Sequence, residues 1–234
     1  MRKDSEWNSK DVWKELDTKG KIQYFKDYYM VPIIAAIVVI LIVGSFLYHI
    51  IFPKPGPKLY VAVYDLTLDS EASDALKAEL ASKVGSEVSP EQIVIDDTFR
   101  SDSSKDMERL QVLVANHSID VVIANDKTTK QLAGFGFLVN MKDVLDKSTI
   151  KSLSDENKLL ITPGFDDEEN SISIEDNGNG KGEAQPYAVR IDGSEEWKKL
   201  AGDFRDYRNF SIVMDADHQD NAKSFLNELL DTEF

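Results

Sequence analysis

The feature that most constrains this chain is an apolar stretch at residues 28–52, which reads YYMVPIIAAIVVILIVGSFLYHIIF. It contains no Asp, Glu, Lys or Arg. A bilayer core of about 30 Å needs roughly 20 apolar residues in a helix that rises about 1.5 Å per residue. A cleavable signal peptide would have a shorter apolar core followed by small residues, whereas this stretch ends in bulky side chains. The stretch therefore predicts an uncleaved transmembrane helix.

Positive charge is distributed unevenly around the predicted helix. Seven Lys or Arg residues precede it, and only Lys54 and Lys58 stand just after it. Because Lys and Arg are enriched in segments on the cytoplasmic side of a membrane, we expect residues 1–27 to form a cytoplasmic tail. The sequence thus predicts a single-pass cell-membrane protein with a cytoplasmic N-terminus and an extracellular C-terminal part.

Short segments on either side of the helix have their own signals. Residues 53–57, PKPGP, predict a stiff extended spacer, because proline restricts its own φ and the conformation of the preceding residue. Residues 9–16 can form two helical turns, which either anchor Trp13 at the membrane interface or dock a cytoplasmic or membrane partner. The remaining residues, 58–234, are long enough for one domain with a hydrophobic core.

Composition narrows the partners that this domain can have. The chain has 27 Lys and Arg against 42 Asp and Glu, for a formal net charge of −15. The tail is slightly basic, so residues 28–234 carry a net charge of −16. An acidic surface repels nucleic acid and anionic lipid headgroups, which argues against nucleic-acid binding. The chain has no cysteine, which excludes disulfides and thiolate sites, and an exported domain without disulfides is typical of bacteria.

Strand and helix patterns alternate after the spacer. Residues 59–64 form a continuous apolar run of the kind found in strands that are covered on both faces. Two further strands are predicted at residues 93–95 and 120–124. Helices are predicted after the three strands, at residues 69–84, 104–116 and 126–133. This order predicts an α/β fold, a doubly wound and mostly parallel sheet with helices on both faces.

The pattern weakens after residue 147. Residues 166–183 are rich in Asp, Glu, Asn and Gly, and predict a long acidic loop with a short strand at 171–174. The loop offers the hard oxygen ligands that calcium takes, but it lacks the spacing of an EF-hand. We interpret it as a solvated loop, with a calcium site as the alternative. After the loop, two strands are predicted at residues 186–191 and 209–214, and a final helix is predicted at residues 221–230.

Polar side chains gather where the predicted parallel strands end. In open α/β sheets, ligands bind beyond the carboxyl ends of the strands. We therefore expect a ligand or partner surface at this edge, and helix caps or turns are the alternative role of the same side chains. The candidate residues are Tyr64, Asp65, Thr98, Asn125 and Asp126, together with the neighbouring Asp96 and Asp97.

The sequence contains none of the catalytic motifs that we searched for. The chain lacks Gly-x-Ser-x-Gly, His-Glu-x-x-His and the Gly-x-x-x-x-Gly-Lys-Ser/Thr phosphate loop, and its three histidines are dispersed. We therefore predict a protein that is not an enzyme and that uses neither a cofactor nor a metal.

The order of elements resembles the extracellular solute-binding proteins of bacterial ABC importers, which have the type 2 periplasmic-binding fold. The segments that carry the resemblance are LYVAVYD at 59–65, SIDVVIAND at 118–126, GFGFLVNMKDVLD at 134–146 and DADHQDNAKSFLNELL at 215–230. The tail segment IQYFKDYYM is similar to that of small membrane-anchored relatives in Firmicutes. Only about 40 residues separate Asp146 from Gln185, too few for a second lobe with its own core, so the resemblance implies a single lobe.

The sequence thus predicts a membrane-anchored, non-catalytic binding or interaction module that resembles one lobe of a solute-binding protein. A single lobe cannot enclose a small ligand as a two-lobed clamp does. The expected partners are the lipid bilayer, through residues 28–52, and another membrane or surface protein. The alternative function is a weak solute-binding or sensing component of an ABC-type transport system, whose ligand would be a small solute.

Overall fold

The computed structural model describes residues 17–52, 56–84, 88–166, 179–202 and 208–230. The chain divides into two compact units, Met1–Pro55 and Gly56–Phe234, and each is described by itself. The strand predicted at 171–174, the helical turns at 9–16 and most of the acidic loop lie outside the described residues.

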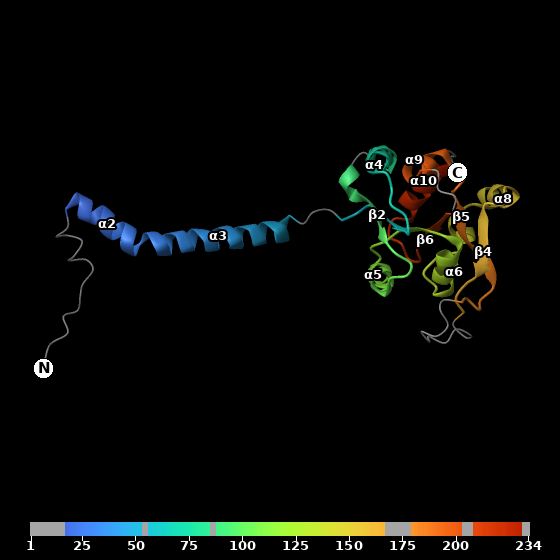
Figure 1. Cartoon of the computed structure of the whole chain (residues 1–234), viewed down its shortest axis with the longest axis horizontal. Helices are drawn as coiled ribbons and strands as arrows, with labels where there is room; N and C mark the ends of the chain where they lie inside the picture. The colour runs from blue at the N-terminus through green and yellow to red at the C-terminus, as the bar shows by residue number, and fades with distance from the viewer. Residues whose placement is uncertain (1–16, 53–55, 85–87, 167–178, 203–207, 231–234) are drawn as a thin grey trace. The chain divides into compact units, whose positions relative to one another are not determined.

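The first unit contains two helices, α2 over Thr18–Tyr28 and α3 over Met30–Ile51 (Figure 1). Asp17 caps α2, and its side-chain Oδ1 accepts a hydrogen bond from the Gly20 amide at 2.8 Å. The 22 residues of α3 give a length of about 33 Å. No residue of its most apolar part is buried, and within the described part of the chain it is the one helix long and apolar enough to cross a membrane.

The second unit is built on one six-stranded mixed sheet of order β2-β1-β3-β6-β5-β4. The strands are β1 Leu59–Tyr64, β2 Ile93–Phe99, β3 Val121–Ala124, β4 Leu159–Pro163, β5 Ala184–Arg190 and β6 Asn209–Ile212. Strand β1 is parallel to both β2 and β3. The pairings of β3 with β6, of β6 with β5 and of β5 with β4 are all antiparallel.

The prediction of a mostly parallel sheet is therefore wrong for the second half of the domain. Parallel neighbours need a crossover of about a dozen residues or more, usually a helix, as the connections through α4 and α5 provide. Strands β4 and β5 follow each other along the chain and pair antiparallel. Their pairing extends the same sheet, so the described residues form one sheet and not two.

Helices at most of the expected positions surround the sheet. They are α4 Ser70–Val84, η1 Pro90–Gln92, α5 Ser104–Ala115, α6 Asp126–Gly134, α7 Met141–Val144, α8 Lys147–Asp155, α9 Glu195–Ala201 and α10 Gln219–Leu230. Helices α4, α5, α6 and α10 confirm the predicted helices, and their bounds agree to within two residues at each end. Helices α7 and α8 and strand β4 were not predicted.

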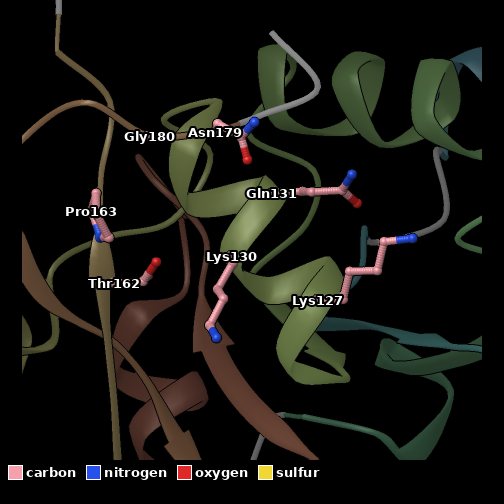
Figure 2. Close-up of a pocket in the computed structure, with 7 residues that line it drawn as sticks. All are labelled: Lys127, Lys130, Gln131, Thr162, Pro163, Asn179 and Gly180. Carbon is pink, nitrogen blue, oxygen red and sulfur yellow. The ribbon is translucent and has the colours of Figure 1, made fainter.

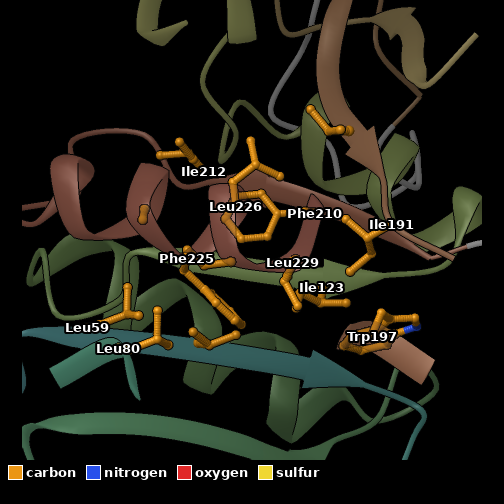
Figure 3. Packing of buried hydrophobic residues seen from close by; sticks show 14 of the residues in the cluster. Leu59, Leu80, Ile123, Ile191, Trp197, Phe210, Ile212, Phe225, Leu226 and Leu229 are labelled. Carbon is orange, nitrogen blue, oxygen red and sulfur yellow. The ribbon is translucent and has the colours of Figure 1, made fainter. Parts of the chain in front are cut away.

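Alternating residues of the central strands supply two hydrophobic clusters, one on each face of the sheet. Val61 and Val63 of β1 face the cluster that includes residues of α4, α9 and α10. Ala62 and Tyr64 face the opposite cluster, to which α5 and α6 contribute. Figure 1 shows the same division, with α4, α9 and α10 on one side of the sheet and α5 and α6 on the other. The larger cluster is centred on Phe210 and the residues of α10 (Figure 3).

Candidate functional site

The candidate residues lie along one edge of the sheet, because β1, β2 and β3 are parallel and end on the same side. Asp65 follows β1, Thr98 is the penultimate residue of β2, and Asn125 and Asp126 follow β3. They do not form a single cluster. The structure distributes them over two hydrogen-bonded groups, one around β1 and β2 and one where β3, β6 and β5 meet.

Tyr64 belongs to the core, which corrects its assignment to a ligand surface. Its side chain is fully buried and packs against Phe99, with 5.3 Å between the ring centroids. The hydroxyl has no hydrogen-bond partner among the described residues. Burial raises the pKa of Tyr64 far above its ordinary value. The physical reason is the strand alternation, which points Tyr64 toward the face covered by α5 and α6.

Asp65 organises the turn that follows β1. Its backbone lies in the left-handed region, with a φ of 52°, which aspartate tolerates better than most residues. Its Oδ1 accepts a hydrogen bond from the Ser101 amide at 2.9 Å, which joins the loops after β1 and β2. A shallow hollow of about 590 Å³ lies between these loops. Its lining residues are Asp65, Leu66, Thr67, Arg100, Ser101, Asp102 and Ala201.

Thr98 takes part in a polar cluster on the α5 side of β2. The cluster centres on Asp96, which accepts hydrogen bonds from the Tyr60 hydroxyl at 2.9 Å and from the Thr98 hydroxyl at 2.6 Å. Arg109 of α5 forms an ion pair with Asp96, and its guanidinium lies 4.4 Å from the centroid of the Phe99 ring. These contacts tie α5 to the edge strand β2.

The Asp96 cluster should make stability depend on pH in the acid range. Burial raises the pKa of Asp96, but hydrogen bonds from Thr98, Tyr60 and Arg109 outweigh it and hold the pKa below its usual value. A lowered pKa stabilises the folded state above the unfolded-state value of about 3.9, and this contribution is lost as the pH falls through the folded value.

We expect Asp96→Asn to lower the free energy of unfolding by about 1–2 kcal/mol at neutral pH. The difference from wild type should begin to shrink near pH 4, where the carboxyl of the unfolded state becomes protonated, and should shrink further as the pH falls toward the lowered pKa of folded Asp96. Urea unfolding between pH 3 and 7 measures it. A difference that stays constant over this range would contradict the assignment.

Asn125 and Asp126 hold the start of α6 against the antiparallel half of the sheet. The Asn125 side chain caps the helix by accepting from the Thr128 amide at 2.9 Å. Asp126 accepts a hydrogen bond from the Asn209 side-chain amide at 2.8 Å and forms an ion pair with Arg190 at 3.3 Å. These contacts agree with the alternative prediction, that polar residues at this edge act as helix caps or in turns. Asn125 is a helix cap, and Asp126 links α6 to β6 and β5.

Arg208 is a residue at this edge that the sequence did not indicate. It is 1% exposed, and its guanidinium donates to the carbonyl oxygens of Tyr64 at 3.0 Å and Asp65 at 3.4 Å. Because β3 lies between β6 and β1, the side chain reaches across the end of β3. The gap between the two groups of candidate residues is therefore spanned by a buried arginine.

A second hollow, of about 600 Å³, lies beside α6 and the edge strand β4 (Figure 2). Its lining residues are Lys127, Lys130, Gln131, Thr162, Pro163, Asn179 and Gly180. The chain approaches itself closely here, because a Cβ atom on Gly180 would overlap the carbonyl oxygens of Pro163 and Gly164. Sequence reasoning missed this hollow because β4 was not predicted, although the run Leu159–Pro163 contains the apolar residues of a strand.

Metal-binding geometry is not present in the described residues, among which no group of three or more His, Cys, Asp or Glu is placed to hold an ion. Of the acidic loop, Asp166 and Glu183 are described, and the intervening acidic residues are not. The edge residues and the two hollows are thus the features from which a function can be argued. Comparison with protein-family models, curated proteins and solved structures gave no match for this chain.

Proposed function

We propose that this chain is a single-pass membrane protein whose C-terminal α/β domain is a non-catalytic binding module on the extracellular side. The observation that carries the proposal is α3, whose large apolar side chains are exposed while an independent compact unit follows it. Exposed apolar surface of this extent is unfavourable in water and favourable in a bilayer. The excess of Lys and Arg before α3 supports a cytoplasmic N-terminus.

Cysteine labelling tests this topology directly, because the chain has no cysteine of its own. Ser9→Cys places a thiol in the tail, and Ser154→Cys places one on the exposed surface of α8. In intact cells, a membrane-impermeant maleimide should label the Ser154→Cys variant and leave the Ser9→Cys variant unmodified. Both variants should react after lysis, which is the control for accessibility. Labelling of only the Ser9→Cys variant in intact cells would show that the topology is the opposite of the one proposed.

The hydrogen bonds of the residues at the carboxyl edge of the sheet support the proposal that the domain is non-catalytic. The carboxylates of Asp65, Asp96 and Asp126 all accept hydrogen bonds that join loops, strands or helices. Arg208 is engaged with backbone carbonyls in the interior. Polar groups held in this way stabilise the edge of the sheet, and the edge offers a shaped surface for a partner.

The resemblance to one lobe of a solute-binding protein is part of the same proposal. It is supported by the three parallel strands β1, β2 and β3 with helices on both faces, and by β4 and β5, which extend that sheet. A single lobe leaves the carboxyl edge open to another protein. Affinity purification of the full chain from solubilised membranes should retain a membrane or surface protein that a bait of residues 1–55 does not. Equal recovery with both baits would show that the domain is not the binding module.

A second candidate function, capture of a small solute for transport or sensing, is favoured by the hollow beside α6 and β4. Its volume of about 600 Å³ falls within the range of about 300–1,000 Å³ that is usual for ligand sites. This hollow lies on one face of a single sheet and has no second lobe to close over it in the described residues, so the affinity is expected to be low.

A further inference from the structure

The charged residues that line the hollow beside α6 and β4 are all basic among the described residues, in a domain whose composition is strongly acidic. Lys127 and Lys130 both line it, and neither forms an ion pair within the described part of the chain. The lining contains no Asp or Glu among the residues that the structure describes. Several other lysines of the domain lie within salt-bridge distance of a carboxylate, for example Lys77 with Asp74 and Lys198 with Glu195.

Thr162 of β4 also lines the hollow and offers it a hydroxyl group. The residue is 5% exposed, and its hydroxyl, which makes no hydrogen bond to the described residues, is open to the hollow. Figure 2 shows its oxygen directed into the space between β4 and α6, on the side where Lys130 extends from the helix. A hydroxyl open to the hollow can hydrogen-bond with water or with a ligand there. A serine or threonine here is not required by the packing of β4, because valine has the same shape.

We propose that this hollow binds a small oxyanion, the carboxylate or phosphate group of a solute. The ammonium of the exposed Lys130 and the Thr162 hydroxyl are the principal donors, with the Lys127 ammonium and the Asn179 amide beside them. Ammonium and hydroxyl groups supply the donors that an oxyanion accepts from, and charge-assisted bonds are the stronger ones. The inference rests on the second candidate function, capture of a small solute.

The test uses the full chain in detergent and three probes, namely inorganic phosphate, citrate and chloride, at constant ionic strength. Thermal unfolding and titration calorimetry should show saturable binding of phosphate or of citrate, and none of chloride. Thr162→Val should weaken binding about tenfold, as loss of one hydrogen bond to a charged acceptor implies, without lowering the unfolding temperature. Lys130→Ala should weaken it by more than tenfold, because it removes both a charge-assisted bond and the ammonium charge.

Lys151→Ala is the matched control, since Lys151 is an exposed lysine of α8 with no ion pair in the described residues. It removes the same charge and should leave binding unchanged. Saturation by phosphate alone identifies a phosphate ligand, and saturation by citrate alone identifies an organic acid. Absence of saturation with both probes, or equal weakening by Lys130→Ala and Lys151→Ala, would overturn the proposal. Cysteine labelling and affinity purification would still decide the membrane topology and the partner separately.

Discussion

Replacing Phe225 with alanine should lower the free energy of unfolding of the C-terminal domain by about 3–5 kcal/mol. Phe225 lies on α10, is 1% exposed, and meets Phe210 of β6 edge to face with 5.7 Å between the ring centroids. Figure 3 shows it at the centre of the larger hydrophobic cluster, between α10 and the sheet. Truncation removes the transfer free energy of the ring and leaves a cavity that surrounding residues fill only in part.

Urea unfolding of the full chain in detergent, followed by near-ultraviolet circular dichroism, measures this change. A domain of this size has a total stability of about 5–15 kcal/mol, so the variant should unfold at much lower urea concentration. Val112→Ala is the control, because Val112 is 59% exposed on α5 and its truncation should cost less than about 0.5 kcal/mol. Similar midpoints for both variants would contradict the placement of α10 over the sheet.

Replacing Asp120 with alanine should have the second-largest effect, a loss of about 2–4 kcal/mol. Asp120 is 2% exposed and precedes β3. One oxygen accepts a hydrogen bond from the Tyr60 amide at 2.8 Å, and the other accepts from the His218 amide at 3.0 Å. The carboxylate therefore joins the start of β1 to the turn before α10, and its removal leaves two amides without their acceptor.

Asp120→Asn separates the hydrogen bonds from the side-chain volume. The asparagine has nearly the same shape and keeps one acceptor oxygen, so it should lose only part of the stability that alanine loses. Thermal and urea unfolding of the two variants should therefore rank wild type above Asp120→Asn, and Asp120→Asn above Asp120→Ala. Equal stability of wild type and Asp120→Ala would show that water satisfies both amides and that the carboxylate does not hold these segments together.

Local patterns were sufficient for most of the elements. The apolar run over Leu59–Tyr64 and the spacing of apolar residues in α4, α5 and α10 predict their structure because a strand or helix must bury its apolar side. Helix α8 also had a local signal that was missed. Asp146 caps it by accepting from the Ser148 and Thr149 amides, and Thr149 and Leu153 form its buried side, four residues apart.

The sequence predicted the edge at which the candidate residues lie but not the contacts that they make there. Asp65 and Asp126 stand at the ends of β1 and β3, as any residue after a parallel strand must. Their partners, Ser101 and Arg190, come from distant parts of the chain. Contacts over such separations depend on which loops meet in space, and a single sequence does not carry that information.

The sequence by itself determined the apolar membrane-spanning candidate, the acidic charge of the domain and the alternation of strands and helices through β3. These properties are local, because they depend on length, composition and periodicity within a few turns of chain. Only the tertiary structure decided the antiparallel direction of β4, β5 and β6, the burial of Arg208 and the hollow beside Thr162. Strand direction and pocket shape follow from how distant segments pack together, and the free energy of that packing is shared among residues far apart in sequence.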